Sequence, residues 1–397
     1  MSYTPASSAL SGLRVVDFSR VRAGPNCVRI LADFGADVVR VEPPPGVDPN
    51  DTMFAHRRDG GDFQNTNRNK RSMTLDLKSE GARPILQRLL SQADVVVENW
   101  RPDVKARLGL DYDTLSALNP RIILASISAY GESGPYAERP GFDQVIQGMG
   151  GLMSITGEPG RGPMRVGIAV ADMGAGLYAA IGVLVALAER ERSGRGQWVQ
   201  TSLLRSQIAL LDFQAARYLN EGDVPESTGN DHPTSCPMGL FRASDGHFNL
   251  GAAGEGNWRR LCNVLQHPEW AQRPEFSTAS GRVERRQQVN AMLQEVFDTR
   301  PVQHWVEALN AAGVPAGPVY TIPQMFDDAQ VRHLAVTSTL PTGAGPRAYL
   351  RQPVDLSRTQ HSVVRPAPGC GEHSAEILGE LGFGPDEIDA LRAGKVI

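Results

Sequence analysis

The stretch LRVVDFSRVRAGPNCVRILADFGADVVRVE, residues 13–42, contains the pattern that decides the fold. Its two ends, 13–19 and 37–42, are rich in β-branched residues, which is typical of strands. The segment between them is typical of a helix, because Pro25 suits a helix start and Gly35 suits a helix end. A strand, a helix and a second strand in this order predict a parallel βαβ unit.

The same alternation continues beyond residue 42. After a polar loop to about residue 78, we expect a helix over 80–93, strands over 94–100 and 121–130, a helix over 173–188, a strand over 197–202 and a helix from about 203 to 222. Strands that are apolar on both faces suit a parallel sheet covered by helices on both sides. The pattern therefore predicts a doubly wound α/β domain that binds its ligand at the carboxyl ends of the strands.

The composition changes at EGDVPESTGNDHPTSCPMG, residues 221–239, which is rich in Gly, Pro, Ser, Thr and Asp. Such a composition is typical of a loop and indicates a domain boundary. Strand-like and helical patterns follow over about 240–325, and they predict a smaller α+β unit.

Composition and charge narrow the class of protein. With 397 residues, 41% of them hydrophobic, and a net charge of −4, we expect a soluble globular protein that does not bind nucleic acid. The cysteines have no C-x-x-C spacing and no secretory signal is evident, so we expect a cytoplasmic location. The most apolar stretch, 173–188, falls short of the roughly 18 residues of a membrane span, so we expect a buried helix and no membrane partner.

Common cofactor motifs are missing from the sequence. It has no phosphate-binding G-x-x-x-x-G-K-[ST], no G-x-G-x-x-G after the first strand, no G-x-S-x-G, and no cluster of His and Cys at metal-ligand spacing. We therefore expect neither a metal site nor a nucleotide cofactor. His232 and His373 are in loop-like segments, where a lone histidine is usually structural or incidental.

Asp172 stands between a short apolar run and the long apolar helix, and it has two compatible interpretations. It suits the N-cap of that helix. It also suits a nucleophile, because a helix N-terminus stabilises a carboxylate in its ionised form and an aspartate can attack an acyl group. Gly174 and Gly176 would leave room for a bulky electrophile beside Asp172, although tight helix packing would explain them equally well.

Several motifs, in order along nearly the whole chain, together resemble the class III CoA-transferase family, which includes formyl-CoA transferase, the carnitine CoA-transferases and the α-methylacyl-CoA racemases. They are LSGLRVVDFSRVRAGP (10–25), FGADVVRVEPP (34–44), NKRSMTLDLK (69–78), DVVVENWRP (94–102), RLGL (107–110), LNPRIILASISAYGESGPY (118–136), GFDQVIQGMGGLM (141–153), ADMGAG (171–176) and GVPAGPV (313–319). The ordered set is far more specific than any one of these motifs.

The resemblance implies a Rossmann-like large domain from residues 1–225 and 330–397, and a small α+β domain from residues 226–329. It also implies a homodimer whose two chains interlock like links of a ring. The implied substrates are an acyl-CoA and a small carboxylic acid, with no cofactor beyond the CoA thioester itself and no metal.

The resemblance implies that Asp172 is the catalytic nucleophile. It would attack the donor thioester, with succinyl-CoA a candidate donor, and form a mixed anhydride and then an aspartyl-CoA thioester before CoA passes to the acceptor. Asp143 matches a second family carboxylate near the nucleophile. The matching CoA contacts are Val21, Arg22, Ala23, Leu75, Asp76, Lys78, Asn99 and Arg107, among which Lys78 and Arg107 suit the CoA phosphates.

Departures from the family pattern bear on the substrate. Phe142 stands where the racemases have a histidine, which argues against the alternative of a 2-methylacyl-CoA racemase with Asp143 as base. Arg22, together with the missing glycine-rich loop of formyl-CoA transferase, argues against oxalate and suits a dicarboxylic acid whose distal carboxylate Arg22 would hold. Pro43 replaces a basic residue that often contacts the adenine side of CoA. A non-catalytic acyl-CoA binding protein is a third interpretation.

Overall fold

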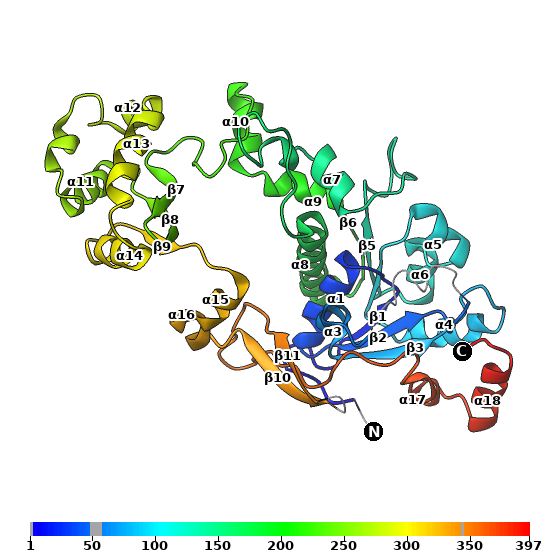
Figure 1. Ribbon diagram of the computed structural model, residues 1–397. Coiled ribbons are helices and arrows are strands. Elements are labelled where there is room, and N and C mark those ends of the chain that lie inside the picture. Colours follow the sequence, from blue (N-terminus) through cyan, green and yellow to red (C-terminus); the bar gives the residue numbers. More distant parts are fainter. Residues whose placement is uncertain (1–2, 48–57, 343–344) are drawn as a thin grey trace. The chain divides into compact units, whose positions relative to one another are not determined.

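A computed structural model describes residues 3–47, 58–342 and 345–397 of the 397-residue chain. The chain divides into two compact units (Figure 1). The first contains Met1–Leu152, Val166–Gly222 and Ala335–Ile397, and the second contains Met153–Arg165 and Asp223–Leu334.

The first unit is built on a six-stranded parallel sheet in the order β3-β2-β1-β4-β5-β6. Its strands are β1 (Arg14–Asp17), β2 (Asp37–Glu42), β3 (Lys70–Thr74), β4 (Val95–Glu98), β5 (Ile123–Ser128) and β6 (Trp198–Ser202). The expected βαβ unit is present, because α1 (Ala23–Asp33) connects β1 to β2. The strand order reverses between β1 and β4, the place where open α/β sheets bind their ligands.

Helices cover both faces of the sheet. Besides α1, the helices of this unit are α3 (Gly61–Asn67), α4 (Ala82–Ser91), α5 (Pro102–Leu108), α6 (Tyr112–Leu118), α7 (Asp143–Met149), α8 (Val170–Ser193), α9 (Leu203–Leu210), α10 (Phe213–Glu221), α17 (Ser374–Glu380) and α18 (Pro385–Ala393). Val15 of β1 packs into an apolar core with α1 and α8, whereas its neighbour Val16 packs into a second core with α4, α17 and α18. Alternating side chains of one strand thus fill two cores. The C-terminal part of the unit also holds the hairpin β10 (Thr337–Thr342) and β11 (Gly345–Leu350).

The expectation of a polar loop to residue 78 is wrong for the described part of that range, which contains α3 and β3. The run NRNKRS is strongly polar, yet β3 is buried throughout. Its charges are tolerated because each has a partner. The pairs are Arg68 with Asp33 at 2.7 Å, Lys70 with Asp17 at 3.0 Å, and Arg71 with Asp37 at 2.6 Å.

Two other helices differ from expectation. The helix expected from about 203 to 222 is broken into α9 and α10 at Asp212, whose φ is +47°. α8 is 24 residues long, and only nine of them are buried. By length and composition α8 could cross a membrane, although 44% of its most apolar window is buried inside the protein.

The second unit has a three-stranded antiparallel sheet of β7 (Met238–Ala243), β8 (Gly246–Gly251) and β9 (Ala316–Pro318). Its helices are η1 (Leu152–Ser154, bridging the two units in sequence), α11 (Glu255–Val264), η2 (Pro268–Gln272), α12 (Ala279–Glu284), α13 (Arg286–Phe297), α14 (Val302–Ala311), α15 (Ile322–Asp327) and α16 (Ala329–His333). Phe248 and Phe297, 4.9 Å apart and edge to face, lie at the centre of its own apolar core. Edge-to-face packing of this kind contributes to a core that belongs to the second unit alone.

Candidate active site

The carboxyl ends of β1 to β4 lead into a hollow in the first unit. A cavity of about 260 Å³ is lined by residues that follow these strands, among them Phe18, Leu75 and Trp100. A neighbouring cavity of about 90 Å³ is lined by Val21 and Asp62 among others. The cavities lie at the switch in strand order, where the sequence pattern predicts the ligand.

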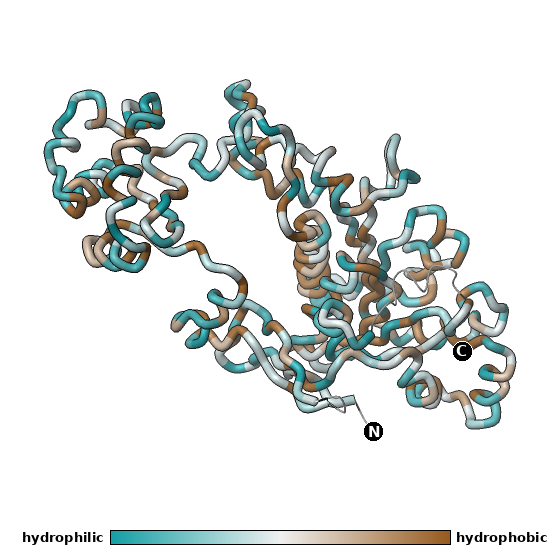
Figure 2. The backbone as a smooth tube through the Cα atoms, in the orientation of Figure 1, coloured by the Kyte–Doolittle hydropathy of each residue, from teal (hydrophilic) through white to brown (hydrophobic). Residues whose placement is uncertain are grey.

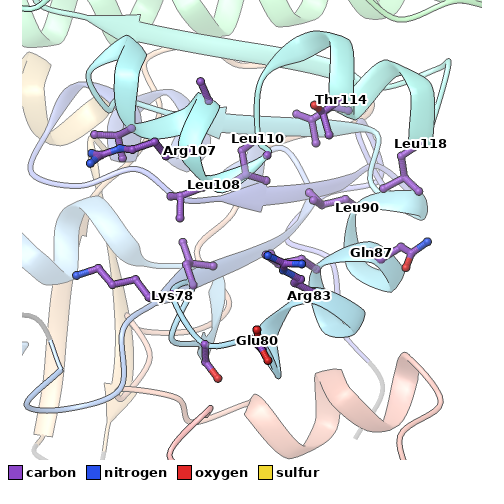
Figure 3. A pocket seen from close by; sticks show the side chains of 17 residues that line it. Lys78, Glu80, Arg83, Gln87, Leu90, Arg107, Leu108, Leu110, Thr114 and Leu118 are labelled. Carbon is purple, nitrogen blue, oxygen red and sulfur yellow. The ribbon is translucent and has the colours of Figure 1, made fainter.

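A larger cavity of about 960 Å³ between α4, α5 and α6 continues from this hollow (Figure 3). It shares Leu77, Lys78, Val104 and Leu108 with the 260 Å³ cavity. Figure 3 shows the side chains of Lys78 and Arg107 extending toward the same side of the cavity. Two cations are thus exposed beside apolar walls, an arrangement that suits a ligand with phosphates and a flat ring.

Hydrogen bonds to backbone groups fix the turn that carries Lys78. Leu75 is buried directly after β3. The carboxylate of Asp76 accepts a hydrogen bond from the Lys78 N–H at 3.1 Å, and the Asp76 N–H donates to the carbonyl of Val396 at 2.8 Å. The turn is therefore fixed while the Lys78 side chain remains exposed.

Asn99 fixes the loop after β1. Its side-chain oxygen Oδ1 accepts from the Arg20 N–H at 2.8 Å, and its side-chain nitrogen Nδ2 donates to the Arg20 carbonyl at 2.8 Å. Both ends of the Asn99 amide therefore hold the backbone of one residue. Asn99 thus orders the loop that leads to Val21 and Arg22.

Val21, Arg22 and Ala23 form the start of α1. Val21 has a φ of +64°, a region that β-branched residues rarely adopt. Arg22 is the N-cap residue, and Ala23 is the buried first residue of the helix. The Nη2 of Arg22 lies 2.9 Å from one carboxylate oxygen of Asp62 and 3.0 Å from the other.

Asp172 is the third residue of α8, and the N-cap position belongs to Ala169. The N-cap interpretation of Asp172 is therefore wrong. The carboxylate that caps this helix is that of Asp143, whose Oδ1 accepts from the Ala171 N–H at 2.8 Å and from the Asp172 N–H at 3.4 Å. A cap supplied from another helix satisfies N–H groups that the first turn leaves without partners, and the side chain of Asp172 is thereby released from this task.

Gln147 holds the capping carboxylate in place, and the sequence interpretation missed it. Its Nε2 donates to the second oxygen of Asp143 at 2.7 Å and to the Ile168 carbonyl at 3.1 Å. Its Oε1 accepts from the Val166 N–H at 2.9 Å. Gln147 is fully buried one helical turn after Asp143, and this four-residue spacing is the signal that would have indicated it.

The electrostatics of Asp172 also differ from expectation. Burial, and after it the negative charge of Asp143, raise the pKa of the Asp172 carboxyl to about 6, against the lowering effect of the positive charge of Arg22. The sequence interpretation considered only the helix N-terminus, which favours the ionised form, and did not include desolvation, which is the largest effect on this pKa. With a pKa of about 6, Asp172 is mostly ionised at pH 7 and is more basic than an exposed aspartate.

The two glycines after Asp172 are packing residues. A Cβ added to Gly174 would lie 2.8 Å from Leu210 Cδ1, and one added to Gly176 would lie 2.6 Å from the Ala23 carbonyl oxygen. Both positions are therefore filled by neighbouring helices. Of the two explanations open at the sequence level, the structure supports tight helix packing rather than space for an electrophile.

The remaining polar candidates have structural contacts. The Nδ1 of His373 accepts from the Ser72 N–H at 3.2 Å, and burial lowers its pKa. The Nδ1 of His232 lies 3.3 Å from the Thr234 N–H, within its own loop. Within residues 3–47, 58–342 and 345–397, no three His, Cys, Asp or Glu side chains are grouped so that they would hold a metal ion.

Comparison with known proteins gives a consistent result. The sequence pattern of CoA-transferase family III matches residues 10–374. Succinate–glutarate CoA-transferase of Agrobacterium fabrum is 39% identical over 94% of this chain and 95% of its own length. Human succinyl-CoA:glutarate CoA-transferase is 32% identical over 94% of this chain and 86% of its own length. The crystal structure of a CAIB/BAIF family protein from Brucella suis has a TM-score of 0.82 and 36% identity, and covers 94% of this chain and 100% of that one.

Proposed function

The chain belongs to CoA-transferase family III and is a CoA-transferase, and from this premise we propose that it transfers CoA from succinyl-CoA to a second dicarboxylic acid. The observation that carries the proposal is the Asp172 carboxylate, which is partly buried in the first turn of α8. The charge of Arg22 acts on this carboxylate, and Asp143 rather than Asp172 caps the helix. The names of the relatives support succinyl-CoA as donor and a C5 dicarboxylic acid such as glutarate as acceptor.

We propose that the reaction proceeds through Asp172 in two halves. The carboxylate attacks the carbonyl of succinyl-CoA, so that a mixed anhydride forms and CoA leaves as a thiolate. The thiolate attacks the aspartyl carbonyl, which gives an aspartyl-CoA thioester and free succinate. The acceptor carboxylate then attacks that thioester, forms a second anhydride and releases CoA, and CoA attacks the acceptor carbonyl to give the new thioester and free Asp172.

The protein contributes position and charge. Holding the CoA thiolate next to each carbonyl replaces a bimolecular encounter by an internal one, which accounts for effective molarities of roughly 10⁵ M or more. The raised pKa of Asp172 makes its carboxylate a better nucleophile than that of an exposed aspartate. No cofactor other than the CoA thioester takes part in this scheme, and no metal is needed to polarise a thioester.

The cavities at the strand ends are the proposed CoA site. Lys78 and Arg107 would bind phosphates, and Leu75 with neighbouring apolar residues would contact the adenosine. Val21 and Ala23 would face CoA through their backbone, while Asp76 and Asn99 shape the two loops that enclose it.

The structure offers less support for a racemase. Phe142, at the position of the racemase histidine, cannot transfer a proton, and its side chain is 57% exposed. The carboxylate of Asp143 is engaged by N–H groups of α8 and by Gln147. Asp143 is therefore not a free base of the kind that α-proton transfer needs.

We also propose that the protein is a homodimer in the cytoplasm, as the family resemblance implies. One face of α8 exposes five large apolar side chains at a helical spacing, and Figure 2 shows the hydrophobic character of this helix. They are Leu177, Tyr178, Ile181, Leu184 and Val185, each at least 40% exposed. Such a stripe needs a cover in solution, and a second chain supplies it without a membrane.

The proposed function is tested by incubating the protein with succinyl-CoA and a panel of short dicarboxylic acids and identifying new acyl-CoA esters by mass spectrometry. We expect glutaryl-CoA or a C4–C6 relative with the wild type and none with Asp172→Ala. Undiminished transfer by the variant would reject Asp172 as the nucleophile. Deuterium exchange at Cα of a 2-methylacyl-CoA, without transfer, would instead support the racemase.

A further inference from the structure

The ion pair between Arg22 and Asp62 lies next to the nucleophile. A single nitrogen, Nη2 of Arg22, contacts both carboxylate oxygens of Asp62, at 3.0 and 2.9 Å. The side chain of Arg22 is 32% exposed and that of Asp62 is 70% exposed. Solvent and small ions can therefore reach the pair, and another carboxylate can reach the guanidinium.

Helix packing places Arg22 at the level of the first turn of α8. The Ala23 carbonyl, one residue after Arg22, is so close that a Cβ on Gly176 would lie 2.6 Å from it. Farther along α1, the Nδ2 of Asn26 lies 3.0 Å from the sulfur of Met173, the residue after Asp172. The positive charge of Arg22 accordingly lowers the pKa of Asp172.

The backbone holds Arg22 in this place at a cost. Val21 is in the left-handed region with a φ of +64° and is β-branched, a combination that persists only where the surroundings determine it. Those surroundings are the Asn99 amide on Arg20 and the Asp17 carboxylate, which accepts from the Ser19 N–H at 2.9 Å. The backbone position of Arg22 is thus set by the fold, whereas Asp62, on α3, contacts it only through the exposed ion pair.

We propose that Asp62 occupies the place on Arg22 that the distal carboxylate of a dicarboxylic substrate takes when it binds. The proposal rests on the proposed function and adds a residue that determines specificity. A dicarboxylate exchanges one carboxylate on Arg22 for another, so the guanidinium keeps a partner beside the reacting centre. A monocarboxylic acid has nothing to exchange, so the pair stays closed and Arg22 contributes no binding to that acid.

Asp62 then competes with the substrate carboxylate for Arg22. Removing the charge of Asp62 should therefore strengthen the binding of the dicarboxylic acid. Asp62→Asn keeps the side-chain size but leaves Arg22 without an anionic partner from the described residues. We expect the KM for glutarate to fall by about two- to fivefold, the size of an exposed ion pair. The KM for pentanoate, which has the same chain length without the distal carboxylate, should stay unchanged, and kcat should change little for either acid.

The test measures kcat and KM for glutarate and pentanoate with succinyl-CoA as the fixed donor. Asp59→Asn is the matched control, because Asp59 is an exposed aspartate three residues away whose backbone carbonyl, rather than its carboxylate, contacts Arg347. Arg22→Met should abolish the preference for glutarate over pentanoate, and Arg22→Lys should restore part of it.

The proposal is overturned if Asp62→Asn raises the KM for glutarate, or shifts the two acids equally, or behaves like Asp59→Asn. These outcomes are distinct from failure of the proposed function. If wild type transfers CoA to no acid, the function itself is wrong. If wild type and Asp62→Asn both transfer CoA with the same preference, only the role of Asp62 is wrong.

Discussion

The first turn of α8 and the hollow at the strand ends differ in how exposed their polar side chains are. At α8, Asp143 and Gln147 are buried, and their oxygens and amide meet specific backbone partners. In the hollow, Lys78 and Arg107 are exposed and line one cavity. Buried hydrogen bonds make the geometry independent of the ligand, whereas exposed cations acquire their role only when an anion binds. Changes at α8 should therefore affect kcat and changes in the hollow should affect KM.

Replacing the nucleophile should have the largest effect. Asp172→Asn keeps the size of the side chain and removes the attacking carboxylate, so kcat should fall by a factor of at least about 10³. Binding of CoA, measured by calorimetry, should remain within a few fold of wild type. Loss of CoA binding together with activity would mean that the two regions are not separable.

The second largest effect should come from Gln147→Leu, which removes the donor to Asp143 and the acceptor for the Val166 N–H. We expect kcat to fall by about 10- to 100-fold because the start of α8 shifts, with KM for succinyl-CoA nearly constant. Gln144→Leu, at an exposed position on the same helix, is the control. If both variants lose stability alike and Gln147→Leu keeps its kcat, Gln147 has only a structural role.

In the hollow, Arg107→Ala should raise the KM for succinyl-CoA by about two- to fivefold and leave kcat unchanged, because an exposed cation contributes a modest, screened attraction. The increase should shrink as salt is added. Arg83→Ala, on the far side of the same cavity in Figure 3, should have a smaller effect. A drop in kcat for Arg107→Ala would contradict the division between the two regions.

The smallest effect concerns pH. Because the carboxylate is the reactive form and burial raises the pKa of Asp172 to about 6, kcat/KM should fall as the pH drops through about 6. Asp143→Asn removes a negative charge that raises this pKa, so the acid limb should move to lower pH, by less than about one unit. A limb that stays in place or moves upward would show that Asp143 acts on Asp172 only through geometry.

The sequence predicted the regular part of the fold well. β1, α1 and β2 follow from the pattern of residues 13–42, and the mixed α/β fold with a parallel sheet is confirmed. β3 was missed because its charges are buried as ion pairs with residues distant in the chain, such as Lys70 with Asp17. Periodicity alone does not show a partner that the fold brings from elsewhere.

The site was predicted less completely, for a similar reason. The family resemblance that indicated Asp172 is confirmed by the comparisons, whereas the role of Asp172 as nucleophile stays a prediction. The group that caps α8, Asp143, is on another helix. From the local sequence alone we therefore predicted the start of α8 too late and assigned the cap to Asp172. The burial that raises the pKa of Asp172 depends on packing around the carboxyl, which local sequence does not contain.

The most direct measurement is trapping of the intermediate. The protein is mixed with succinyl-CoA without acceptor and quenched, and its peptides are analysed by mass spectrometry with and without hydroxylamine. We predict a CoA thioester on the peptide that contains Asp172, converted by hydroxylamine to an aspartyl hydroxamate at that residue, and neither product in Asp172→Asn. An adduct on another residue, or transfer to an added acid with no adduct at any quench time, would contradict the assignment of Asp172 as the nucleophile.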